Sequence, residues 1–161
     1  MQRRAAWLSL VWLLVSGCGF QLQGRASLTG DTRVVLQVAD NRSAFALAMR
    51  RALLQAGGRV AASDPTPGSL RLSIERDELL ERVASVSALN QPREYELTYI
   101  VRFSLSRDGV TLVESEEISV VRDFSFDERV ALAKAREREL LRESLAAELA
   151  NVILQRVASL R

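Results

Sequence analysis

The sequence predicts an α+β fold, in which an antiparallel or mixed sheet of about four strands packs two helices on one face as a two-layer sandwich. A β-branched strand candidate is followed by an amphipathic helical pattern. Two long alternating segments are then joined by a hairpin turn, and the last third contains neither Gly nor Pro, as a long helix would. The order of strand, helix, antiparallel strands and helix favours this sandwich.

The first strand and helix are predicted from the segment that follows residue 32. Arg33–Val38 is rich in β-branched residues, as strands are, and Asp40–Ser43 supplies residues that cap helices. Apolar residues then recur at three- and four-residue steps, which places them on one helical face: Phe45, Ala48, Met49, Ala52, Leu53 and Ala56. Gly57 and Gly58 end this helix.

Three further strands are predicted in the middle of the chain. After a turn at residues 64–68, apolar residues alternate from Leu70 to Ile74, and this strand continues, bulged or broken, through residues 77–89. The clearest strand is Arg93–Leu105. Its expected core-facing residues are Tyr95, Leu97, Tyr99, Val101, Phe103 and Leu105. A hairpin turn at residues 107–109 leads into the last strand, Val110–Arg122.

The C-terminal segment is predicted to be one long helix that packs on the sheet. Asp127 can cap it, and about 33 residues span roughly 50 Å as a helix. Its apolar stripe consists of Leu141, Leu145, Leu149, Val152, Ile153 and Leu160. The polar face mixes both charges instead of being basic, which disfavours binding of this helix to a membrane surface.

The N-terminus has the pattern of an export signal. Arg3 and Arg4 precede an apolar run of about 11 residues, roughly 16 Å as a helix, which is too short for a bilayer core of about 30 Å. Small residues follow and end at Cys18, which is the sole cysteine and has no disulfide partner. We therefore predict a cleaved signal peptide at residues 1–17, a lipidated N-terminal tether at 18–32 and a single α+β domain at 33–161.

The residues before the cysteine resemble a bacterial lipobox, with Val-Ser-Gly-Cys at positions 15–18. The resemblance implies that the Cys18 thiol receives a diacylglycerol, that cleavage occurs before it, and that the new amine is acylated. Three acyl chains exceed the roughly two signals needed for stable anchoring. Residue 19 is Gly, whereas Asp at this position retains a lipoprotein in the inner membrane under the sorting rule that this pattern resembles. The outer membrane is therefore the expected location.

Composition restricts the chemistry of the exported domain. Removing residues 1–17 leaves 144 residues, enough for one domain. It also removes two of 22 basic residues and none of the 20 acidic ones, so the net charge falls to zero, which argues against nucleic-acid binding. The chain has no His, so Ser-His and Cys-His catalysis is excluded and a zinc site lacks its usual ligands. We expect no enzyme activity, no metal and no cofactor other than the covalent lipid.

Three blocks resemble the LptE family of lipopolysaccharide-assembly lipoproteins. They are residues 18–24 (Cys-Gly-Phe-Gln-Leu-Gln-Gly), residues 94–97 (Glu-Tyr-Glu-Leu), and residues 122–134, which end in Ala-Leu-Ala-Lys. An arginine is commoner in the family where Gln23 stands. The resemblance implies a protein that sits in the lumen of the outer-membrane β-barrel LptD, plugs it, assists its assembly and binds lipopolysaccharide during transport to the cell surface.

The lipid-binding residues of that family transfer only in part. The basic positions that the family uses for lipopolysaccharide fall at Ala88 and Ser119, and neither is basic here. Either the neighbouring Arg93 and Arg122 bind lipopolysaccharide, or this chain acts mainly as a plug. Arginine suits phosphate because its planar guanidinium can donate two hydrogen bonds at once.

Two other functions remain open from the sequence. The chain could be a periplasm-facing lipoprotein that serves as an interaction module of another envelope assembly machine. It could also bind cell wall or glycans, but such proteins present aromatic platforms to sugars, and both tryptophans lie in the predicted signal peptide.

We predict that Cys18→Ala abolishes acylation and leaves an uncleaved precursor, because the thiol is the acceptor of the lipid. Labelling cells with an alkynyl fatty acid measures this directly. Equal label on the wild-type and variant chains would contradict the lipobox and, with it, the expected location.

Overall fold

The computed structural model describes residues 27–28, 32–61 and 66–160. The predicted signal peptide and Cys18 lie outside the described residues, so the boundaries at residues 17 and 32 remain predictions. Among the described residues, no helix combines the length and the apolar character needed to cross a bilayer.

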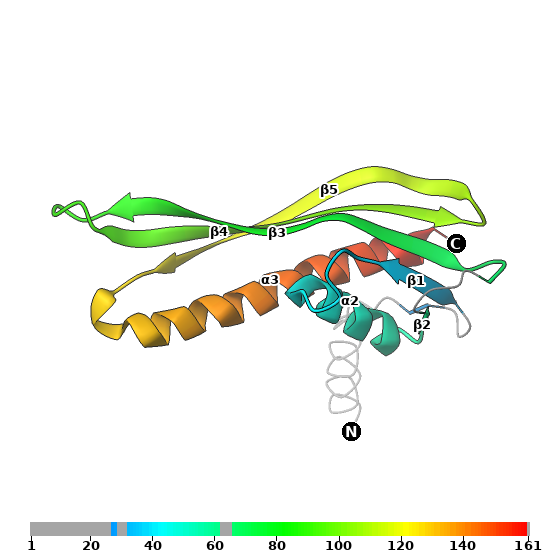
Figure 1. Cartoon of the computed structure of the whole chain (residues 1–161), viewed down its shortest axis with the longest axis horizontal. Coiled ribbons are helices and arrows are strands. Elements are labelled where there is room, and N and C mark those ends of the chain that lie inside the picture. Colours follow the sequence, from blue (N-terminus) through cyan, green and yellow to red (C-terminus); the bar gives the residue numbers. More distant parts are fainter. Residues whose placement is uncertain (1–26, 29–31, 62–65, 161) are drawn as a thin grey trace, which may run out of the picture.

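The described chain folds into a five-stranded mixed sheet with two helices on one face (Figure 1). The elements in chain order are β1 (Arg33–Gln37), α2 (Ala44–Gln55), β2 (Arg59–Ala61), β3 (Leu70–Val86), β4 (Pro92–Arg107), β5 (Val110–Ser125), the 3-10 turn η1 (Glu128–Val130) and α3 (Ala131–Ser159). The strand order is β2-β1-β3-β4-β5. Strand β1 runs parallel to β2 and β3, and the other pairs are antiparallel. The predicted α+β sandwich is confirmed.

Strand β2 was missing from the four-strand prediction. It has only three residues and pairs in parallel with β1, where Arg33 lies beside Arg59. Gly57 has a φ of +85°, which a glycine adopts without strain and which redirects the chain after α2. Three residues are too few to show the alternation from which strands are predicted.

The two helices begin differently from each other. Ser43 is the N-cap of α2 and accepts a hydrogen bond from the Ala46 N–H at 3.0 Å, as the cap segment predicted. Asp127 does not cap α3. Its carboxylate accepts hydrogen bonds from the Arg129 N–H and guanidinium, and this closes the 3-10 turn η1 instead. Helix α3 therefore begins at Ala131, four residues after Asp127, and has no side-chain cap.

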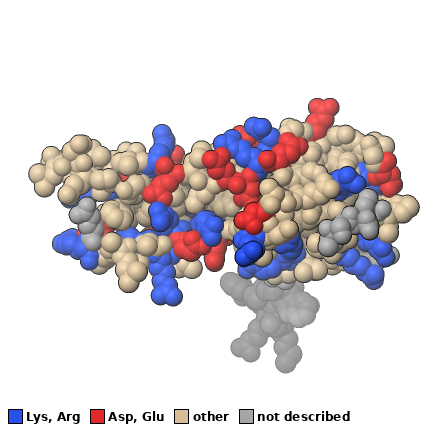
Figure 2. Space-filling view, viewed as in Figure 1, with Lys and Arg blue, Asp and Glu red and all other residues tan. Residues whose placement is uncertain are grey.

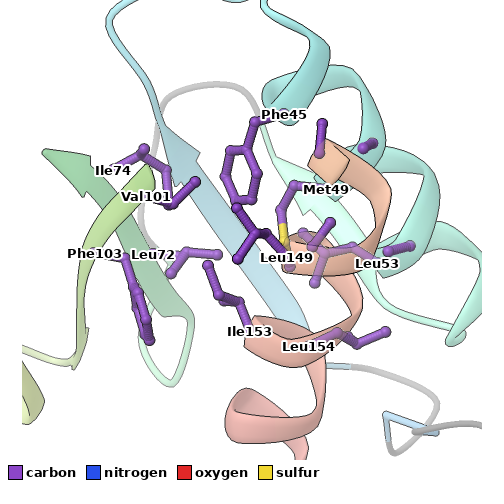
Figure 3. Close-up of a cluster of buried hydrophobic side chains, with 14 of the residues drawn as sticks. Phe45, Met49, Leu53, Leu72, Ile74, Val101, Phe103, Leu149, Ile153 and Leu154 are labelled. Carbon is purple, nitrogen blue, oxygen red and sulfur yellow. The ribbon is translucent and has the colours of Figure 1, made fainter. Parts of the chain in front are cut away.

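The core lies between the inner face of the sheet and the two helices (Figure 3). The inner residues of β4, from Leu97 to Leu105, meet residues of α2 and of the C-terminal half of α3, as predicted for these strand positions. Val152 is the exception in the predicted stripe of α3, because 46% of it is exposed. The fully buried residues of α3 begin only at Leu145.

A partly buried polar contact joins α2 to the sheet. The Tyr99 hydroxyl donates to Asp77 at 2.7 Å, and the Ser43 hydroxyl donates to the same carboxylate. Burial raises the pKa of Tyr99, and the hydrogen bond to Asp77 raises it further. The N-cap of α2 is thus bound to β3 and β4.

The sheet and α3 extend well beyond α2. Strands β3 to β5 and the first half of α3 continue past the end of α2, away from the two short strands (Figure 1). We call this part the distal half. Along it α3 has no fully buried residue, so the apolar contact between the two layers is thin there.

We predict that Phe103→Ala lowers the free energy of unfolding by about 3–5 kcal/mol, because the ring is 1% exposed and its loss leaves a cavity. Urea unfolding measures the change. Val121→Ala is the control: Val121 is half exposed on the opposite face, and its truncation should cost less than about 1 kcal/mol. A Phe103 variant as stable as the control would mean that the helix-facing side is not the core.

Candidate functional site

The distal half ends in the β3–β4 hairpin, which projects from the molecule (Figure 1). Its turn is well bonded: the Ser87 N–H donates to the Gln91 carbonyl at 2.7 Å, and the Asn90 N–H donates to the Ser87 carbonyl at 2.9 Å. Asn90 takes a φ of +59°, which asparagine tolerates. Leu89 at the turn is 83% exposed. The tip therefore presents an apolar side chain on an ordered turn.

A groove of about 560 Å³ runs from this turn to the start of η1, and we call it the tip groove. It is lined by Ser87, Ala88, Leu89, Gln91, Pro92, Arg93, Phe126, Asp127 and Arg129. Hydrogen bonds from Arg129 lower the pKa of Asp127 to about 2, so this carboxylate and Arg129 neutralise each other. Arg93 makes no side-chain hydrogen bond or ion pair with any described residue. The charged residues that line the groove are Arg93, Asp127 and Arg129, so Arg93 leaves the groove with a net positive charge.

A second cavity, of about 240 Å³, adjoins the tip groove between the sheet and the start of α3. We call it the aromatic pocket. Tyr95 stacks on Phe124 with ring centroids 5.6 Å apart, and it meets the edge of Phe126 at the same distance. Lys134 and Arg138 stand at its rim. Phe126 lines both cavities, which makes the apolar pocket and the charged groove neighbours.

The rim cations of the aromatic pocket are partly engaged. Lys134 contacts Glu137 at 2.8 Å and Ser125 at 3.2 Å, and Arg138 reaches across to Glu81 of β3 at 3.1 Å. These contacts hold the start of α3 against the sheet where apolar burial is sparse. The pocket thus combines an aromatic wall with a rim of paired charges.

The two arginines predicted for lipid binding lie apart. Arg122 is on the helix-facing side of β5, opposite Leu97, and its guanidinium is 3.0 Å from Glu148 of α3. Arg93 lies four positions further along β4, roughly 13 Å away along the strands. Arg93 lies near Asp127, whose pKa its charge helps to lower, and Arg122 is paired with Glu148, so the fold does not bring the two arginines into one cluster.

The two family positions that lost their basic residue also lie apart. Ala88 lines the tip groove together with Arg93. Ser119 lies on β5 opposite Ile100, on the face away from the helices.

The sequence analysis did not predict the aromatic pocket. The alternation of β4 did place Tyr95 inward, but only the register of β5 brings Phe124 and Phe126 beside it.

Several carboxylates of β4 and β5 have arginine partners. Glu96 receives two hydrogen bonds from Arg82, which lower its pKa. Glu117 binds Arg102 at 2.7 Å, and Glu116 lies 3.5 Å from Arg156. Within residues 27–28, 32–61 and 66–160, no group of three or more acidic, His or Cys side chains could hold a metal ion. Cys18 lies outside these residues.

Comparison with known proteins agrees with this architecture. A family model named LptE and described as lipopolysaccharide-assembly matches residues 32–157. Rare lipoprotein B of Shewanella oneidensis is 29% identical, with a TM-score of 0.70 over 80% of this chain and 95% of its own. No curated protein matches the chain significantly.

Two other solved structures share the fold. An uncharacterized lipoprotein B of Nitrosomonas europaea is 24% identical, with a TM-score of 0.67 over 88% of this chain and 91% of its own. A minor lipoprotein of Acinetobacter baumannii is 12% identical, with a TM-score of 0.66 over 82% of this chain and 93% of its own. The family model covers most of the chain, so the chain belongs to the LptE family of lipopolysaccharide-assembly proteins.

Proposed function

We propose that the protein plugs the lumen of the outer-membrane β-barrel LptD, assists its assembly, and binds lipopolysaccharide on its way to the cell surface. Membership of the LptE family supports a role in lipopolysaccharide assembly. The observation that carries the plug role is the polarity of the surface, where positive and negative side chains alternate over both layers (Figure 2). A surface of this kind suits a hydrated lumen.

Size limits the barrel that could hold the domain. A chain of 144 residues has a radius of gyration of about 15 Å, whereas a barrel of eight strands has room only for its own side chains. The partner must therefore have many more strands. Ion pairs between α3 and the sheet, such as Arg122–Glu148 and Arg138–Glu81, would help to keep the plug's two layers together.

Lipid binding is proposed at the distal half. Arg93 in the tip groove would donate to a phosphate of lipid A, and the neighbouring aromatic pocket would take part of an acyl chain. Phe126 borders both cavities, so one amphiphile could occupy them together. Arg122 could contribute only by releasing Glu148, and we therefore rank it second.

The proposed location is the outer membrane, with the lipid on Cys18 as anchor. Solved lipoproteins of similar fold support a lipid-anchored envelope protein. After removal of the signal peptide (1–17), the lipidated tether (18–32) would hold the domain (33–161) near the membrane. The role is non-catalytic and uses no cofactor beyond the anchor.

We expect a one-to-one complex with the LptD barrel that survives mild detergent, and a loss of correctly folded barrel when this protein is depleted. Affinity purification from outer membranes and immunoblotting of folded barrel measure the two effects. Recovery of the protein free of any large barrel, with barrel levels unchanged on depletion, would favour the alternative, an interaction module of another envelope machine.

We expect contacts between Arg93 and the phosphates of lipid A to supply most of the affinity for lipopolysaccharide. Arg93→Ala should weaken binding by about tenfold, as loss of a charge-assisted hydrogen bond does, and Arg122→Ala should weaken it less. Competition by lipid A with and without its phosphates measures this, and Arg51→Ala on the exposed side of α2 is the control. Equal competition by lipid A with and without its phosphates would contradict the proposed lipid site, but it would not affect the proposed plug role.

A further inference from the structure

We propose that the free edge of β5 is a docking site for an extended segment of a partner protein in which basic and apolar residues alternate, and which binds as a sixth strand. This goes beyond lipid binding and plugging, and it does not depend on which protein supplies the segment. The open backbone of β5, a groove beside it and the charge of its outer face all favour this partner.

Within the part of the chain that the structure describes, no strand pairs with one side of the β5 backbone. The strand is 16 residues long and lies at the edge of the sheet, whereas the opposite edge, β2, has three residues. The Phe126 N–H donates to the Arg93 carbonyl, so residues 93 and 126 form a hydrogen-bonded pair. The register from Glu94–Ser125 to Phe103–Glu116 has no shift.

In an antiparallel ladder such pairs alternate with non-bonded ones. Every second residue of β5, counted back from Phe126, is therefore hydrogen-bonded to β4. Within the regular part of the strand these residues are Ile118, Val120, Arg122 and Phe124. The N–H and C=O groups of the residues between them point away from the sheet: Glu117, Ser119, Val121, Asp123 and Ser125. These five residues form a template of donors and acceptors for an added strand.

A groove of about 350 Å³ follows this edge on the helix side, and we call it the edge groove. Its apolar lining consists of Phe103 of β4, Ile118 of β5, and Val152 and Ile153 of α3, and the Glu116–Arg156 pair supplies polar lining beside them. Val152 is 46% exposed although its neighbour Ile153 is fully buried. In an added strand, the helix-facing side chains beside Glu116 and Ile118 would point into this groove. Apolar residues at those positions would cover Val152 and Ile118.

The other face of the same edge is acidic. The outward-facing positions of β5 on the open side of the sheet carry Glu117 and Asp123 and no basic residue. Glu117 is bound by Arg102 on its inner side, and Asp123 makes no salt bridge with any described residue. Exposed Glu114 adds a third carboxylate at the bulge of β5, likewise without a salt bridge in the described part of the chain. Basic residues at the alternate positions of an added strand would lie beside these carboxylates.

The most symmetric pairing of two copies of β5 is disfavoured by charge. If two β5 strands paired antiparallel about Val120, Glu117 of each would lie opposite Asp123 of the other. Like charges directly across a strand pair are destabilising. Charges on an edge commonly prevent this kind of self-association. The unpaired carboxylates of this edge favour a different segment, one with positive charge.

The test uses full-length protein in detergent micelles and a nine-residue peptide of alternating Arg and Val. We expect binding to slow hydrogen exchange at the outward-facing amides of Ser119, Val121 and Asp123, measured by NMR. The amide of Val120 is already bonded to β4 and should not change. A matched peptide of alternating Glu and Val should bind at least about tenfold more weakly.

Two variants separate strand addition from contact with side chains. Ser119→Pro removes one outward N–H without removing a bond to β4, and it should weaken peptide binding by about tenfold. Ser119→Ala keeps that N–H and should bind like the wild type. Equal binding by both variants, or protection of no outward amide, would overturn the proposal. Protection of the same amides by concentrated protein alone, or by lipopolysaccharide micelles alone, would assign the edge to a second copy or to lipid, and would also overturn it.

Discussion

The packing of the inner face of β4 against α3 is the contact on which the rest of the structure depends. β4 is hydrogen-bonded to β3 on one side and β5 on the other, so it positions both long strands. Its inner residues are fully buried only where the C-terminal half of α3 lies over them, beside Leu149 and Ile153. Burial of such side chains supplies about 1.5–3 kcal/mol each.

Beyond α2 the same two layers are held by different forces. The contacts there are the aromatic cluster around Tyr95 and ion pairs such as Arg138–Glu81 and Arg122–Glu148. Exposed ion pairs contribute at most about 1 kcal/mol each, so the distal half is the less stable part of the fold. A weakly held end with an apolar pocket is suited to admit a lipid chain, and both cavities of the proposed lipid site are found there.

The alternation of β4 and the hairpin at residues 107–109 were predictable because each depends on residues close in sequence. Asp108 and Gly109 both have positive φ, as an Asp-Gly turn requires. The short strand β2 and the shift of the α3 start to Ala131 were not predictable, since one depends on parallel pairing with β1 and the other on which group bonds Asp127. The sequence could not distinguish Arg93 from Arg122 for the same reason, because only the packing of α3 on β5 shows that Glu148 pairs with Arg122.

Pairing also changes how the abundance of arginine should be interpreted. Twenty-one of the 22 basic residues are arginines, which by composition alone would suggest a surface made for phosphates. In the fold most arginines of the sheet and α3 face a carboxylate, as Arg82, Arg102 and Arg142 do. Their charges are neutralised locally, which suits a surface enclosed by another protein more than one that attracts anions along its whole length. The described groups without an ion-pair partner include Arg93 at the tip, which is a candidate contact for an anion, and Asp123 on the edge of β5, which is a candidate contact for a cation.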